Sequence, residues 1–149
     1  MVLKNEVLLL ARKAMKHFGL QCEVKFLSYR LFKQVAMKSP LIRQVLDEGA
    51  SFAELKIPAL IYHKGHDSIY FCEDILVKLV KHLDGGLKKV FIESVIYHEI
   101  FHVLYEHEVQ QKNFVECLKS EDRVCHSFKK KYPALYKVGY DLHKKATNI

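Results

Sequence analysis

A histidine pair with a carboxylate between its members is the part of this sequence best suited to chemistry. His98 and His102 are four residues apart, and Glu99 directly follows the first of them. On an α-helix these histidines differ by about 40° in direction and lie about 6 Å apart along the axis, so both rings reach one ion. Glu99 lies about 100° from His98 and about 60° from His102, which suits a general base. The spacing therefore predicts a zinc site that performs hydrolysis.

The segment that carries this motif has the pattern of a buried helix. Its apolar residues surround the helical axis, and it contains neither proline nor glycine from Lys88 to Tyr105. A helix that is apolar on nearly every side packs in a protein interior. Buried histidine and glutamate side chains are costly unless they are paired or bind a metal, so burial supports the metal-site interpretation.

Catalytic zinc usually takes three protein ligands and keeps a fourth position for water, so the histidine pair requires another partner. Glu106 shares a face with His98, but it lies about 12 Å further along the same helix and is predicted to be a polar helix end or an outer hydrogen-bonding group. His107 and Glu108 would need a sharp turn after the second histidine, and the glycine that allows this turn in metzincins is missing.

Glu121 is the candidate that best fits the third position. It interrupts an apolar helical stripe whose other members are Phe114, Leu118, Cys125 and Phe128, at spacings of three and four residues. A carboxylate that points inward needs a cation or a hydrogen-bonding partner, and a zinc ion held by the preceding helix would supply one. The alternative role for Glu121 is an inward salt bridge.

The motif His98-Glu99-x-x-His102, followed after eighteen residues by Glu121, resembles the zinc-binding signature of gluzincin metallopeptidases. In these enzymes a glutamate on a following helix completes the site. The short length and a hairpin before the motif helix resemble the minigluzincins, which are compact single-domain members. The resemblance covers roughly residues 58 to 128.

The residues after Glu121 both match this family and depart from it. Val124 and Phe128 fall at the positions of the family's glutamate-helix pattern, whereas many relatives have an aspartate where this chain has Cys125. Latency in compact relatives implies that the end of the chain folds over the cleft and blocks activity. A cysteine as the fourth zinc ligand would have the same effect.

The resemblance implies a zinc-dependent metallopeptidase, active or latent, with Zn²⁺ held by His98, His102 and Glu121. Glu99 would be the catalytic base and would take a proton from the water that zinc activates. A peptide or protein substrate would bind as an added antiparallel strand along residues 68–72. The candidates for a second oxyanion donor are His126, Tyr132, Tyr136 and Tyr140.

The remaining pattern predicts one α+β domain with a small sheet over residues 1–149. The resemblance implies that this domain is zincin-like, with the small twisted sheet packed on the active-site helix and on the following glutamate helix. Gly19 is predicted to end the first helix, Pro40 to open or kink a helix, and Asp84-Gly85-Gly86 to end the helix before the motif. Helices are predicted over residues 3–18, 30–37, 41–46, 74–82, 88–105, about 112–131 and after Pro133, and strands over 22–27, 59–63 and 68–72, the last two joined as a hairpin through residues 64–67.

The composition fits a single domain that needs no disulfides. Of the 149 residues, 50% are hydrophobic, enough for a proper core. The apolar run over residues 7–11 is too short and too closely flanked by charges for a signal peptide or a membrane span, so we expect a cytoplasmic protein without membrane contact.

The four cysteines form no C-x-x-C pair and are predicted to be buried thiols. The alternative is a bridge between Cys22 and Cys72. The other two cysteines are Cys117 and Cys125.

A net charge of +7 allows a second interpretation of the chain. In this interpretation the chain is a basic module that binds nucleic acid or protein through a lysine-rich C-terminal face and keeps a structural or vestigial zinc site. The alternative for the lysines of this face is an ordinary solvated surface without a binding role. A third interpretation keeps the zinc and exchanges the peptide for another ester or amide substrate. The lysines concerned are Lys129, Lys130, Lys131, Lys137, Lys144 and Lys145.

Overall fold

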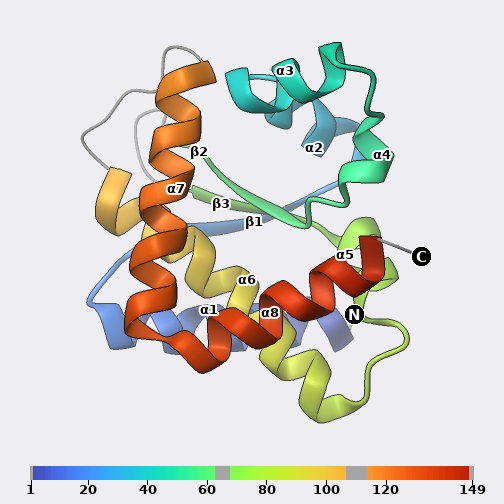
Figure 1. Cartoon of the computed structure of the whole chain (residues 1–149). Helices are drawn as coiled ribbons and strands as arrows, with labels where there is room; N and C mark the ends of the chain where they lie inside the picture. Colours follow the sequence, from blue (N-terminus) through green and yellow to red (C-terminus); the bar gives the residue numbers. More distant parts are fainter. Residues whose placement is uncertain (1, 63–67, 107–113, 148–149) are drawn as a thin grey trace.

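The computed structural model describes residues 2–62, 68–106 and 114–147, which form eight helices and one three-stranded sheet (Figure 1). The helices are α1 (Val2–Phe18), α2 (Tyr29–Ala36), α3 (Pro40–Asp47), α4 (Phe52–Leu55), α5 (Glu73–Val80), α6 (Gly85–Glu106), α7 (Phe114–Lys131) and α8 (Pro133–Thr147). The strands are β1 (Glu23–Leu27), β2 (Ala59–Tyr62) and β3 (Ser68–Cys72). The predicted α+β fold with a small sheet is confirmed.

The sheet has the order β1-β3-β2, with β1 parallel and β2 antiparallel to β3. Figure 1 shows α2, α3 and α4 on one side of it and α1, α6 and α8 on the other. Both edges of β3 are already hydrogen-bonded, so the prediction that a substrate strand pairs with residues 68–72 is wrong. β2 is the edge strand that contacts α6.

Local signals in the sequence explain several of the helix boundaries. Ser28, Ser39 and Ser51 cap the first turns of α2, α3 and α4 by accepting hydrogen bonds from backbone N–H groups three residues later. Gly19 has a φ of +67°, a left-handed conformation that ends α1 without steric cost. Pro40 opens α3 as its first residue, which settles the alternative between opening and kinking.

The stretch Asp84-Gly85-Gly86 begins a helix, whereas we predicted that it ends one. The Asp84 side chain accepts a hydrogen bond of 2.9 Å from the Leu87 backbone N–H, so it caps the start of α6. The preceding helix, α5, already ends at Val80. A short polar and glycine-rich stretch can either end one helix or begin the next. Here the hydrogen bond of the Asp84 side chain makes it the start of α6.

Helix α6 crosses the centre of the domain and contacts α1, α7, α8 and β2. Its buried residues join both hydrophobic clusters of the described chain, as the apolar pattern of the motif segment predicted. In the smaller cluster, Phe101 of α6 stacks on Phe128 of α7 with ring centroids 5.3 Å apart, and Val124 is fully buried beside them. These contacts fix the rotation of α7 relative to the motif helix.

Helix α8 meets α6 at a buried glycine. A methyl group added at Gly139 would overlap the Cβ and Oγ atoms of Ser94, whose hydroxyl donates a 2.6 Å hydrogen bond to the carbonyl of Phe91. Only a residue without a side chain allows the two helices to approach this closely.

We therefore expect Gly139→Ala to destabilise the fold by about 1–3 kcal/mol through overpacking, which corresponds to a fall in Tm of several degrees. Differential scanning calorimetry measures this effect. The control is Gly86→Ala, because a methyl group there meets only the Asp84 carboxylate at an ordinary 3.5 Å. Equal Tm values for the two variants would contradict the close helix contact.

Candidate metal centre

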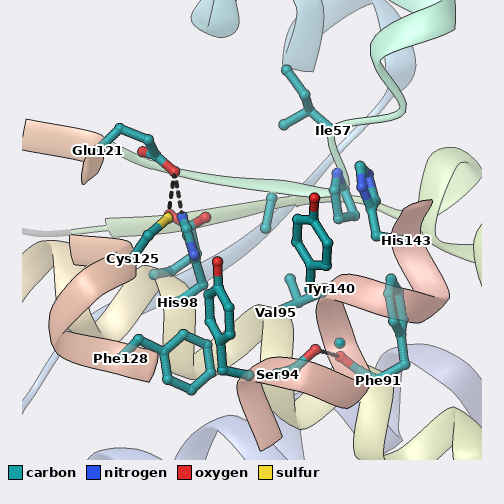
Figure 2. Close-up of a pocket in the computed structure, with 15 residues that line it drawn as sticks. Ile57, Phe91, Ser94, Val95, His98, Glu121, Cys125, Phe128, Tyr140 and His143 are labelled. Carbon is teal, nitrogen blue, oxygen red and sulfur yellow. Dashed lines mark hydrogen bonds and ion pairs between the residues drawn. The ribbon is translucent and has the colours of Figure 1, made fainter. Parts of the chain in front are cut away.

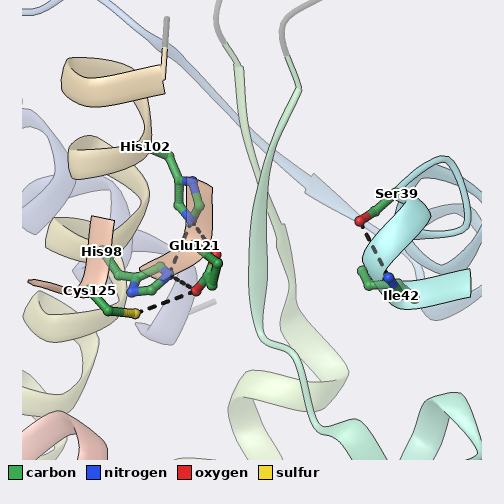
Figure 3. A network of polar contacts seen from close by, with 6 residues as sticks. All are labelled: Ser39, Ile42, His98, His102, Glu121 and Cys125. Carbon is green, nitrogen blue, oxygen red and sulfur yellow. Dashed lines mark hydrogen bonds and ion pairs between the residues drawn. The ribbon is translucent and has the colours of Figure 1, made fainter. Parts of the chain in front are cut away.

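Three of the residues predicted as ligands meet between α6 and α7 (Figure 3). The Nε2 atom of His98 lies 2.9 Å from Oε1 of Glu121, and the Nε2 atom of His102 lies 3.0 Å from Oε2 of the same carboxylate. The two Nε2 atoms are 3.1 Å apart. Two nitrogens and one carboxylate therefore face a single point, which is the donor set that the sequence analysis predicted.

The spacing of these donors fits a small tetrahedral cation. Ligands about 2.0–2.1 Å from zinc with tetrahedral angles stand about 3.4 Å apart. The three separations of 2.9, 3.0 and 3.1 Å lie within about 0.5 Å of that value, a difference that small side-chain rotations remove. The exposed fractions of the His98, His102 and Glu121 side chains, 27%, 14% and 34%, leave the site open to solvent on one side.

The Glu121 carboxylate is strongly favoured in its ionised form. Burial acts to raise the pKa of this carboxyl, but hydrogen bonds from His102 and His98, together with their charge, outweigh burial and hold the pKa well below its usual range. A carboxylate held ionised between two imidazoles is ready to bind a cation. The inward position predicted for Glu121 is therefore found, and the two alternatives for it, ion pair and metal ligand, use the same atoms.

A cavity of about 350 Å³ begins beside these donors. Figure 2 shows His98, Glu121 and Cys125 at one side of it, and Ile57, Tyr140 and His143 at the other. Glu99 also lines this cavity and is only 7% exposed. The predicted base and two of the predicted ligands therefore border one space, whereas His102, on the next turn of α6, is not among its lining residues.

Of the four candidates for a second oxyanion donor, the structure brings Tyr136 and Tyr140 to the cavity. Burial raises the pKa of the Tyr136 hydroxyl, and the charges of Cys125 and other neighbours raise it further, so it remains an O–H donor. Tyr132 packs against Phe18 and Tyr97 instead. The fourth candidate, on the exposed side of α7, is His126.

Helix α8 contributes two cavity residues that the sequence analysis did not select, Gly139 and His143. The Nε2–H group of His143 donates a 3.1 Å hydrogen bond to the backbone carbonyl of Lys56, just before β2. His143 follows Tyr136 by seven residues, which places both on one face of α8, and this spacing was the sequence signal that could have identified His143.

Among the alternatives for the third ligand, Glu106 is the last residue of α6. The other two, His107 and Glu108, lie outside the described residues, as does the predicted turn at residues 64–67.

All four cysteines are thiols in this structure. The alternative of a Cys22–Cys72 bridge is wrong because the two residues lie at opposite ends of paired strands. Glu23, next to Cys22, pairs with Ser68, whereas Cys72 pairs with Leu27. Cys72 and Cys117 are buried as predicted, while Cys22 and Cys125 are half-buried.

The lysine-rich face lies at the end of α7 and along α8. Lys129, Lys130 and Lys131 are exposed, and Lys131 contacts the ring and the hydroxyl of Tyr105. Lys137 pairs with Asp141 at 3.7 Å on the exposed face of α8. Part of this charge is therefore engaged within the chain. Among the described helices, none has the length and apolar composition that crossing a membrane requires.

Comparisons of the chain with protein-family profiles, with curated proteins and with solved structures found no match.

Proposed function

We propose that this protein is a zinc-dependent metallopeptidase with a minigluzincin-type, zincin-like fold. The observation that carries this proposal is the convergence of two imidazole nitrogens and one carboxylate, all within 3.1 Å of their neighbours, beside a cavity lined by Glu99. Two histidines and a glutamate are a common ligand set of catalytic zinc, and they leave one position for solvent. The donor types and their spacing both support zinc over a larger oxygen-preferring cation.

The residues around the site have separable roles in this proposal. When bound, Zn²⁺ would lower the pKa of a water molecule and polarise the substrate carbonyl. Glu99 accepts the water proton on its carboxylate and then gives it to the leaving amine. Tyr136 and Tyr140, which line the cavity from α8, are the candidate hydroxyl donors to the carbonyl oxygen, on which negative charge develops.

The substrate proposed for this site is an extended peptide. The residues that lead into β2, from Ile57 to Ala59, line the cavity, and β2 is an edge of the sheet. An extended chain can pair with such an edge through backbone hydrogen bonds. Much of the rest of the wall is apolar, with Phe91, Val95 and Phe128 among its residues, so it suits an apolar substrate side chain.

Zinc analysis of the purified protein tests this proposal. We expect about one zinc per chain in the wild type and loss of zinc in His102→Ala, because that variant removes one of three ligands. His126→Ala is the control, since this exposed histidine is on α7 and does not line the cavity. The zinc-loaded protein is then incubated with an unfolded protein substrate, with and without a chelator, and cleavage is followed by mass spectrometry.

Two outcomes would overturn the proposal. The first is a protein that contains no zinc after growth in zinc-supplemented medium and takes up none on titration. The second is zinc binding that His102→Ala leaves unchanged, because the ion would then occupy a different site. Cleavage that persists with the chelator present would show a contaminating or metal-independent activity.

A further inference from the structure

Cys125 lies next to the three candidate ligands. It follows Glu121 by one helical turn on α7, so both side chains leave the helix on the same face. Its Sγ atom is 3.7 Å from Oε1 of Glu121, and the ligand atoms of His98, Glu121 and Cys125 all lie within 4.8 Å of one another (Figure 3). Cys125 also lines the cavity in which a substrate would bind.

We propose that Cys125 is a fourth metal ligand, which closes the site to water until its sulfur moves away. This inference rests on the metal site of the proposed function and adds a regulatory state to it. With His98, His102, Glu121 and Cys125 all bound, the metal has the complete set of four ligands that is typical of closed zinc sites. The protein would then be a latent hydrolase.

The distance between Cys125 and Glu121 fits coordination by sulfur. With a zinc–sulfur bond of about 2.3 Å and a zinc–oxygen bond of about 2.1 Å, tetrahedral angles place the two ligand atoms about 3.6 Å apart. The Sγ–Oε1 distance between Cys125 and Glu121 is 3.7 Å. A thiolate also suits the charge of the site, because together with the Glu121 carboxylate it would balance the two positive charges of Zn²⁺.

The other cysteines do not share this environment. Cys72 is buried within β3, and burial raises the pKa of its thiol. Cys117 is buried on α7, two turns before Cys125. Cys22 is half-buried like Cys125, but it precedes β1 and does not line the cavity. Cys22 therefore provides the matched control for every thiol experiment.

Release of the sulfur requires no oxidant. On release, the Cys125 thiolate would take up a proton from solvent and its side chain would rotate away, which would leave one position for water. Any covalent block of the released thiol, for example alkylation, would keep it from returning. The proposal thus predicts that a protein without this thiol is the open form.

Cobalt substitution tests the ligand directly, without a measurement of hydrolysis. We expect the wild type to bind one Co²⁺ per chain and to show a near-ultraviolet sulfur-to-cobalt charge-transfer band. Cys125→Ser is expected to bind cobalt and to lose this band, while Cys22→Ser keeps it. A wild-type protein that binds one cobalt without the band, or a band that persists in Cys125→Ser, would overturn the inference and leave the proposed metal site intact.

Two further measurements separate the outcomes. Mass spectrometry after iodoacetamide treatment should show that zinc slows alkylation of Cys125 by about tenfold or more and leaves Cys22 unchanged. Cleavage of an unfolded protein should be faster in zinc-loaded Cys125→Ser than in the wild type. A cobalt band together with equal cleavage rates would overturn the closure of the site, and failure to bind any metal would overturn both this inference and the proposed function.

Discussion

Glu99→Gln is expected to bind zinc as the wild type does and to lose hydrolysis almost completely. The carboxylate is the proposed proton acceptor, and its amide cannot take a proton from water, so cleavage should fall by about 10²–10⁴-fold. Glutamine has nearly the same size, and Glu99 is not among the three ligand side chains, so the fold and the metal content should remain.

The measurement is cleavage of an unfolded protein by zinc-loaded enzyme, in the wild-type and the Cys125→Ser backgrounds, with metal content determined in parallel. The control is Glu93→Gln, which changes a glutamate of the same helix that does not line the cavity. If Glu99→Gln retained full activity in the open background, the assignment of the base would be wrong. Salt-dependent nucleic-acid binding that is insensitive to this substitution would instead favour the basic binding module.

Zinc is expected to stabilise the fold strongly, because its ligands come from two different helices. A ligand present at a hundred times its Kd adds about 2.7 kcal/mol to the free energy of unfolding. For a domain of this size that corresponds to a rise in Tm of about 5–10 °C. His98 and His102 lie on α6 and Glu121 lies on α7, so a bound ion links these helices through side chains.

Calorimetry with added zinc, and then with a chelator, measures this stabilisation. In Glu121→Gln the rise in Tm should be largely lost, because a carboxamide is a poor zinc ligand. Glu116→Gln is the control, since Glu116 is on the same helix but does not line the cavity. An identical rise in Tm for both variants would show that zinc binds elsewhere on the native protein.

The sequence was most informative where the cause is local. The spacing of His98 and His102 follows from the geometry of one helix, and the apolar surroundings of that helix predict its burial. The position of Glu121 could be predicted because a carboxylate within an apolar stripe must point to the interior, where the neighbouring helix offers partners. These predictions needed only the period of the α-helix.

Features that depend on long-range packing could not be predicted in this way. The parallel pairing of β1 with β3 joins segments separated by three helices and a strand, and no local pattern specifies it. Because this pairing could not be predicted, we expected β3 to be an edge strand to which a substrate strand could be added. The approach of α8 to the cavity could not be predicted for the same reason. An amphipathic pattern indicates which face of a helix is buried, but it does not indicate which other helix that face contacts. Gly139 marks the place where α8 meets α6, but a glycine within a helix has several explanations and does not identify the partner.

The contact between Gly139 and Ser94 also has a consequence for the substrate of the proposed function. Tyr136, Tyr140 and His143 share one face of α8, and the glycine between them rests directly on the helix that holds the two histidines. In the proposed function, a bulky substrate that displaced α8 would break the hydrogen bond between His143 and Lys56. If the cavity binds substrate as proposed, we therefore expect it to favour small substrate side chains over bulky ones.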